Sequence, residues 1–273
     1  MVRLGPNQYG KAENRVVRVY RDTDVHVLRD LNVSTSLRGD FEAAHIAGDQ
    51  RDVLPTDTQK NTAFAFAKEE GVRAIEEYAL TLGRHFLTAA PAATGARIAV
   101  EEYPWERVGD HSFVRAGGGV RTTVVEVSAT DEIVVSGIKD LVLMNTTGSE
   151  FKGFLKDAYT TLQETDDRIL ATSLETTWRY TSTGLDFDTV YAEIRRLLIT
   201  TFAETHSLAL QQTLYAMGEA VLSAVEDVAE ISFSAPNKHH LLVDLSPFGV
   251  GNPGEVFIAA DRPYGLIEAT VVR

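Results

Sequence analysis

The stretch Asn237–His240 carries an amide, an amine and two imidazoles in consecutive positions, directly after Pro236. Proline fixes φ and removes a backbone donor, so we expect the chain to turn or to change its partner strand there. Successive side chains of a strand point to opposite faces, which would place Asn237 and His239 on one face. An amide and an imidazole that converge in this way can bind a small polar ligand and relay its protons. The plain alternative is an edge turn with a solvated basic patch.

Three further residues are suited to a planar anion. Phe151 offers an aromatic face for stacking, and the guanidinium of Arg168 offers a planar fork of donors. The amide of Gln211, at the start of a predicted helix, can both donate and accept along one edge of a ligand. Taken singly, each residue has an ordinary alternative: core packing for Phe151, a surface ion pair for Arg168 and a solvated first turn for Gln211.

The stretch Leu54–Thr62 predicts the start of a helix, because Thr56 or Asp57 can act as N-cap and Pro55 favours a break before it. The free N–H groups and the positive dipole end of a helix N-terminus suit an anion. The alternative is a capped helix that binds nothing. Lys11 precedes a strand-like run, where a solvated edge lysine is the ordinary interpretation.

The elements that must position these residues follow a pattern that occurs twice, namely strands, two helices and further strands. Strands are expected at Arg15–Tyr20, Val25–Leu37, Ala96–Trp105, His111–Arg115, Val120–Val127, Val134–Met144, Ile169–Tyr180, Val228–Phe233, His239–Leu245, Glu255–Ala260 and Leu266–Val272. Helices are expected from about Thr56 to Gly71, over Ile75–Phe86, over Asp188–Glu204, and from a cap at Ser207 to about Val225. Hairpin turns are expected at Asp22–Asp24 and at Gly117–Gly119. The periodicity establishes an α+β fold with helices on one sheet face.

Composition narrows the range of functions. The 273 residues carry a formal net charge of −13, which argues against nucleic acid or an anionic membrane as the main partner. An anionic substrate would therefore need a local Arg or Lys. The chain has no cysteine, which excludes disulfides and thiolate chemistry. The seven histidines show no metal-ligand spacing, and no glycine pattern for nucleotides opens a helix, so we expect neither metal nor cofactor.

Several of these motifs resemble those of the urate oxidases (uricases). The resemblance rests on Tyr9–Lys11, on Leu54–Thr62, on the run from Leu141 to Arg168 with Phe151, Phe154, Tyr159 and Leu162 at matching positions, and on Pro236–His239 before Asp244. The long run is the specific one, and its Met144–Asn145 departs from the usual Leu-Lys. The resemblance extends from Tyr9 to the C-terminus and therefore covers nearly the whole chain.

The resemblance implies a fold and an assembly. Uricases have tandem tunnelling-fold (T-fold) domains, each an antiparallel sheet with paired helices on one face, so we expect halves at 1–135 and 136–273. Their chains assemble as homotetramers into a barrel with active sites at the subunit interfaces. The end Val271–Arg273 is not a Ser-Lys-Leu peroxisomal address, and no signal-peptide pattern is present, so we expect a bacterial-type, cytoplasmic enzyme.

The resemblance also implies a reaction. It predicts a cofactor-free oxidase that converts urate, dioxygen and water to 5-hydroxyisourate and hydrogen peroxide. The implied catalytic residues are Lys11, Thr56 and His239, and the implied substrate-binding residues are Asp57, Phe151, Arg168, Leu210, Gln211 and Asn237. Two alternatives stay open, a related T-fold enzyme acting on a pterin or another purine, and a catalytically silent purine-binding protein.

Overall fold

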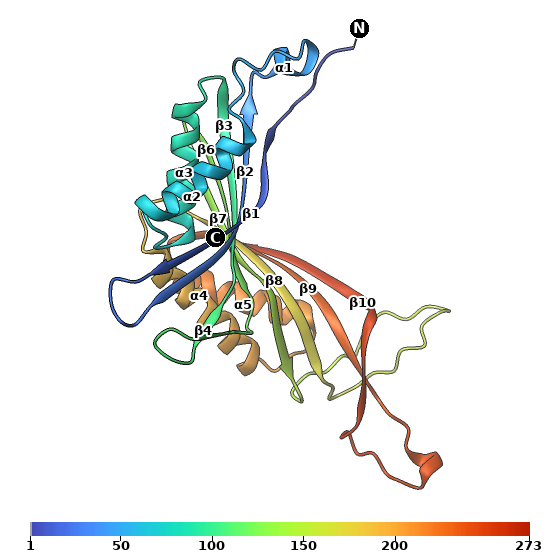
Figure 1. Cartoon of the computed structure of the whole chain (residues 1–273). Coiled ribbons are helices and arrows are strands. Elements are labelled where there is room, and N and C mark those ends of the chain that lie inside the picture. Colours follow the sequence, from blue (N-terminus) through green and yellow to red (C-terminus); the bar gives the residue numbers. More distant parts are fainter. Residues whose placement is uncertain (1) are drawn as a thin grey trace. The chain divides into compact units, whose positions relative to one another are not determined.

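The computed structural model describes residues 2–273, except for the side chain of Asp261, and the chain forms two compact units (Figure 1). The first unit contains the chain up to Ile138 together with Arg179–Thr189, and the second contains Lys139–Trp178 and Val190–Arg273. Each unit joins a pair of long helices to an antiparallel sheet. The prediction that 1–135 and 136–273 are two T-fold halves stays a prediction.

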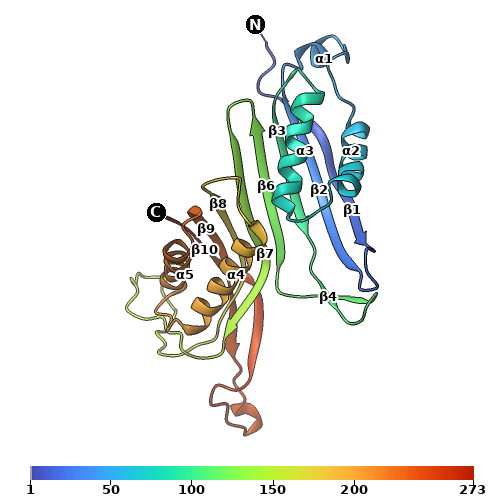
Figure 2. The same ribbon diagram turned by 90° about the vertical axis from the view of Figure 1, so that its left-hand side faces the viewer.

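In the first unit, four strands form an antiparallel sheet in the order β1-β2-β3-β6. Their bounds are β1 (Tyr9–Tyr20), β2 (Val27–Gly39), β3 (Ala93–Glu102) and β6 (Val120–Ser128). Helices α2 (Thr56–Glu69) and α3 (Ile75–Ala89) lie on one face of these strands (Figure 2). The hairpin and both helices match the prediction, and a short helix α1 (Glu42–Ile46) was not predicted.

A group of buried charges ties several elements of the first unit together. Arg121 of β6 donates to Glu76 in the first turn of α3 at 2.7 Å and to Asp188 at 2.5 Å. The side chain of Glu76 is 0% exposed and that of Arg121 is 7% exposed. Ser136 donates to the second oxygen of Glu76 at 2.6 Å. Buried charges need such pairing and hydrogen bonding, so this group fixes the register of the helix on the sheet.

The second unit contains the later strands and the second helix pair. Strand β7 (Glu132–Asn145) crosses the division between the units at Ile138, and β8 (Leu170–Tyr180) neighbours β9 (Val228–Leu242). Strand β9 pairs antiparallel with β10 (Phe257–Val272), and helix α5 (Leu210–Ala224) packs on both. Helix α4 (Phe187–Glu204) precedes α5 and agrees with the predicted range.

The predicted break at Pro236 is wrong, because β9 continues through it to Leu242. The irregularity lies on the partner strand instead. Ala260 pairs with His239 and Gly265 pairs with Asn237, so residues 261–264 of β10 bulge opposite the single residue Lys238. The bulge contains Pro263, and bulges are positions at which a strand can accept a proline, whereas Pro236 itself pairs with Leu266.

Two other predictions are also wrong, one about the end of a strand and one about a hairpin turn. The predicted strand Ala96–Trp105 ends at Glu102, and β4 (Trp105–Arg107) begins after Pro104, which cannot donate to a ladder. Strand β4 pairs with β5 (Phe113–Arg115) in a separate two-stranded sheet, whereas β6 pairs with β3. Gly117–Gly119 therefore connects two sheets and is not a hairpin turn.

Candidate active site

A pocket of about 140 Å³ in the second unit contains four of the predicted site residues. Its lining is formed by the segment that leads into β8 and by the C-terminal part of β9: Phe151, Leu162, Gln163, Thr165, Arg168, Ile169, Asn237, His239, His240 and Leu241. Phe151 and Arg168 are thus in one cavity with Asn237 and His239, although more than 60 residues separate the two segments in the sequence.

Arg168 supplies the positive charge of this pocket. Its guanidinium lies over the ring of Phe151, with Cζ 5.1 Å from the ring centroid. None of the described carboxylates forms an ion pair with it, and its buried Nε has no hydrogen-bond partner among the described residues. Burial lowers the pKa of Arg168. An arginine that is half-buried and unneutralised provides the local cation that an anionic ligand would need in a chain of net charge −13.

Backbone hydrogen bonds hold Phe151 beside Arg168. Phe151 N–H donates to the carbonyl of Thr165 at 2.9 Å, and Thr165 N–H donates back at 3.1 Å. Arg168 N–H donates to the carbonyl of Ser149 at 2.7 Å. Phe154 stacks on Phe151 with ring centroids 5.0 Å apart and planes inclined by 15°. The aromatic ring and the guanidinium fork therefore have a fixed separation before any ligand arrives.

Asp167 adds a second constraint on the same segment. One carboxylate oxygen accepts from the Thr147 hydroxyl at 2.8 Å and the other from Gly148 N–H at 2.9 Å. These bonds, the Thr147 hydroxyl first, lower the pKa of Asp167. The carboxylate thereby joins the turn before Ser149 to the residue next to Arg168.

Ser207 was predicted to cap α5, and this prediction is wrong. The N-cap is Ala209, without a side-chain cap, and Ser207 is instead fully buried. Ser207 N–H donates to Gly148 at 2.9 Å, its carbonyl accepts from Glu150 at 2.8 Å, and its hydroxyl accepts from Thr213 at 2.8 Å. Ser207 therefore joins the segment before Phe151 to the start of α5.

The start of α5 holds two more predicted residues, but neither lines the pocket. Leu210 is buried as the first residue of the helix, and Gln211 follows it with an exposed side chain. The sequence had placed Gln211 at a helix start, and that part is confirmed.

Lys11, Thr56 and Asp57 lie in the first unit. Lys11 is half-buried on β1, just before a register shift between Lys11 and Asn14. Thr56 is the first residue of α2, and its hydroxyl makes no capping bond because the N-cap is Pro55. Lys60 contacts the carboxylate of Asp57 and lowers its pKa, with a smaller contribution from Lys11. Lys11 therefore lies near enough to the start of α2 to act electrostatically on Asp57.

The pocket also contains residues that sequence reasoning left without a role. Leu162, Gln163 and Thr165 come from the long segment before Arg168, and His240 comes from β9. The sequence indicated the loop residues only through their position in the run from Leu141 to Arg168. A loop has no repeating pattern of apolar residues, so the sequence does not show which of its side chains point into a pocket.

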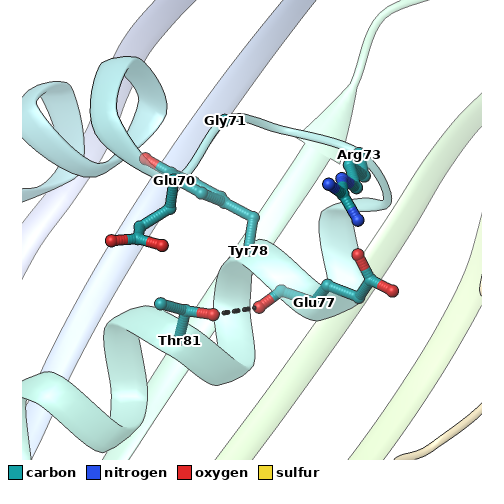
Figure 3. Close-up of a pocket in the computed structure, with 6 residues that line it drawn as sticks. All are labelled: Glu70, Gly71, Arg73, Glu77, Tyr78 and Thr81. Carbon is teal, nitrogen blue, oxygen red and sulfur yellow. Dashed lines mark hydrogen bonds between the residues drawn. The ribbon is translucent and has the colours of Figure 1, made fainter.

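A different pocket, of about 250 Å³, lies between α2 and α3 and contains none of the predicted site residues (Figure 3). It is lined by Glu70, Gly71, Arg73, Glu77, Tyr78 and Thr81. Thr81 donates to the backbone carbonyl of Glu77 at 2.9 Å. Two carboxylates against one guanidinium make this pocket a poor site for an anion, so we assign it no ligand.

Comparison with known proteins decides the family. A family model described as Uricase matches residues 7–126 and 134–268. A uricase of Arthrobacter globiformis is 56% identical over 272 residues, which cover 99% of this chain and 90% of that protein. A uricase of Dictyostelium discoideum is 36% identical and covers 100% of this chain and 98% of its own length.

The chain belongs to the uricase family. The crystal structure of the Arthrobacter globiformis uricase agrees with this chain at a TM-score of 0.97, covering 100% of this chain and 96% of the other. The urate oxidase of Bacillus sp. TB-90 has a TM-score of 0.87 at 23% identity and supports the fold alone. These structures confirm the predicted α+β tunnelling fold. Uricases oxidise urate with dioxygen, so this chain is an oxidoreductase, and the two alternative functions lose their support.

Among the side chains of residues 2–260 and 262–273 there is no group of three or more His, Cys, Asp or Glu placed to hold a metal ion. Over the same residues no helix is long and apolar enough to cross a membrane.

Proposed function

We propose that urate binds as an anion in the pocket between Phe151 and β9. The purine ring stacks on Phe151, and Arg168 donates two parallel hydrogen bonds to its oxygen and ring nitrogen. The backbone N–H of Leu210 and the amide of Gln211 form further hydrogen bonds to the edge of urate. The backbone of Asp57, at a helix N-terminus, also contacts the ligand. The observation that carries this proposal is the unpaired, half-buried guanidinium of Arg168 over Phe151.

Lys11, Thr56 and His239 form the proposed proton relay. They remove a proton from bound urate monoanion and leave an electron-rich dianion that reduces dioxygen directly. Asn237 holds dioxygen, or the attacking water, above the ring. Urate, one dioxygen and one water give one 5-hydroxyisourate and one hydrogen peroxide: urate loses two electrons, dioxygen gains two, and water supplies the new hydroxyl at C5. No cofactor enters this scheme, and the protein positions the reactants and moves the protons.

Lys11 and Thr56 lie in the first unit of the chain, whereas His239, Phe151 and Arg168 lie in the second. We propose that they meet at the subunit interfaces of a homotetramer in which the T-fold halves of several chains close a barrel. The pocket volume supports this. At about 140 Å³, the pocket of one chain is smaller than the usual ligand pocket of about 300–1,000 Å³, so residues of another chain are needed to complete it. A cytoplasmic location is part of the proposal, and cell fractionation with an antibody tests it.

Loss of urate absorbance, measured together with oxygen uptake, tests the reaction. We expect equal molar consumption of urate and dioxygen, unchanged after exhaustive chelation, and no flavin or haem absorbance in the purified protein. Activity that disappears on chelation and returns with one metal would overturn the cofactor-free scheme. Turnover of a pterin without urate oxidation, or purine binding without any oxygen uptake, would support one of the two alternatives.

A further inference from the structure

Two buried polar side chains connect Lys11 to the segment that leads into Thr56. Gln59 of α2 is 0% exposed and Thr35 of β2 is 6% exposed. The Thr35 hydroxyl donates to Oε1 of Gln59 at 2.7 Å and accepts the backbone N–H of Lys11 at 3.4 Å. Nε2 of Gln59 donates to the carbonyl of Leu54 at 3.4 Å. A continuous chain of hydrogen bonds therefore runs from the backbone of Lys11 to the residues just before Thr56.

These two polar side chains occupy positions where apolar ones are expected. The other buried residues on the same faces of the strand and helix are Leu31, Val33, Leu37, Ala63 and Ala67. Valine would match the shape of Thr35 without bringing a hydroxyl into the core. A buried amide and hydroxyl cost free energy unless both are hydrogen-bonded, and here they satisfy each other. The pair thus forms a link that an apolar core would not provide.

Gly10 shows that the backbone beside Lys11 is pressed against Thr35. A Cβ on Gly10 would lie 1.8 Å from the carbonyl oxygen of Thr35. Only glycine allows this approach. On the other side of Lys11, the ladder shifts register, and Glu13 N–H donates to the Ser34 hydroxyl at 2.9 Å. Lys11 is therefore held on both sides by contacts to β2.

We propose that Thr35 and Gln59 are positioning residues for the relay, which set the position of Lys11 relative to Thr56 without touching the substrate. This inference rests on the proposed assignment of Lys11 and Thr56 to proton transfer. The Thr35 hydroxyl fixes the strand that carries Lys11, and the Gln59 amide fixes the segment that carries Thr56. Proton transfer depends steeply on such geometry, whereas substrate binding in the pocket of the second unit does not involve these side chains.

Thr35→Val tests the link because it removes the hydroxyl and keeps the shape. We expect kcat for urate to fall about 10- to 100-fold, part of the factor that a positioned base contributes, while KM and the Kd of an unreactive xanthine change by less than about twofold. The pH profile of kcat should also shift. Thr35→Ser retains the hydroxyl and should restore most of kcat. Thr122→Val, on β6 of the same sheet, is the matched control and should leave kcat and the pH profile unchanged.

A double variant separates positioning from stability. Thr35→Val leaves Oε1 of Gln59 buried without a donor, which destabilises the fold, whereas Thr35→Val with Gln59→Met replaces both partners by apolar groups. We expect the double variant to recover thermal stability and to keep the low kcat. Wild-type kcat in the double variant, or an equal loss in Thr35→Val and Thr35→Ser, would overturn the positioning role. Lys11→Met is measured alongside. If Lys11→Met is inactive while the double variant has wild-type kcat, only the positioning role fails. If Lys11→Met keeps wild-type kcat, the relay fails as well.

Discussion

At the scale of single residues, Arg168 shows how a negatively charged protein can attract an anion. Carboxylates outnumber cations in the sequence, and several arginines pair with a carboxylate, such as Arg15 with Asp30 and Arg84 with Glu132. Arg168 instead faces an aromatic ring and a cavity. Its charge is therefore available to a ligand, and the planar fork selects ligands with two acceptors on one edge.

Arg168→Lys retains the charge and loses the fork. We expect the binding of urate to weaken by about 1.5–3 kcal/mol, as for a lost charged hydrogen bond. Steady-state kinetics and the Kd of a xanthine measure the change. Arg21→Lys, in the exposed turn after β1, is the control and should behave as wild type. Unchanged KM and kcat in Arg168→Lys would show that Arg168 does not hold the substrate.

Lys11 and Thr56 should act as one unit. Lys11→Met and Thr56→Ala should each lower kcat far more than they weaken the binding of an unreactive xanthine. Because either substitution alone already stops proton transfer through the relay, the double variant should be little less active than either single variant. Rapid-mixing kinetics on the three variants measure the effect. Losses in activation free energy that simply add would contradict a shared relay.

The sequence indicated some residues of the proposed site and missed others. Asn237 and His239 line one pocket, as strand alternation predicted, although Pro236 did not end the strand. Thr35 and Gln59 gave no signal, because a polar residue in a strand or in a first helical turn is ordinarily exposed. Their burial depends on which elements pack together, and a local pattern does not contain that information.

At the scale of elements, the segment between Ser149 and Arg168 has no regular secondary structure and is still well fixed at both ends. Its ends are joined by the bonds of Phe151 to Thr165 and of Arg168 to Ser149, and Asp167 adds its carboxylate. These hydrogen bonds restrict the movement of Phe151 and Arg168 relative to each other, although both residues lie in a loop.

Asp167→Asn tests the carboxylate in this loop. The pKa of Asp167 is lowered in the folded state, so its contribution to stability is present above the ordinary Asp pKa of about 3.9 and is lost as pH falls through the lowered folded value. We expect Asp167→Asn to be less stable than wild type at neutral pH and the difference to shrink below about pH 3.9. Urea unfolding at neutral pH and below about pH 3.9 measures the difference in the free energy of unfolding, with Asp22→Asn as an exposed control. A difference that grows on acidification would be the opposite of this linkage.

Arg121→Met tests the buried charges under α3. Removal of one partner leaves Glu76 charged, buried and without its cation, so we expect a loss of about 3–5 kcal/mol in the free energy of unfolding. Adding Glu76→Gln should recover part of the loss, since the amide is neutral. Arg196→Met, which breaks an exposed pair with Glu193, should change stability little. Unfolding is measured at one protein concentration because assembly shifts it. A stable Arg121→Met would mean that the pair does not support the fold.

The sequence predicted the helices better than the connections. The stripe of α3, with Ile75, Tyr78, Leu82 and Phe86 buried, repeats at helical spacing and needs no tertiary context. The pairing of β4 with β5 and the bulge opposite Lys238 depend on partners distant in sequence. Proline and glycine marked where irregularity occurs, but not which strand would carry it.

At the scale of the whole molecule, the proposed site draws residues from both units, which has a consequence for assembly. Of the proposed relay, Lys11 and Thr56 belong to the first unit, whereas His239 belongs to the second unit together with Phe151 and Arg168. A protein in which one interface joins the two sets can be active only as an oligomer, and a closed ring of strands would also remove the exposed sheet edges. Size-exclusion chromatography with light scattering should therefore show a homotetramer.

Complementation tests whether a site is shared between chains. Thr56→Ala and Arg168→Ala homomers should each be nearly inactive, because every site lacks one residue. If chains mix at random on co-refolding, about a quarter of the sites should combine an intact Thr56 with an intact Arg168, and that share of activity should return. Phe151→Ala mixed with Arg168→Ala is the control, since both residues come from the same unit and no intact pair can form. If mass spectrometry shows exchanged chains while the first mixture stays as inactive as its parents, Thr56 and Arg168 act within one chain and the shared site is wrong.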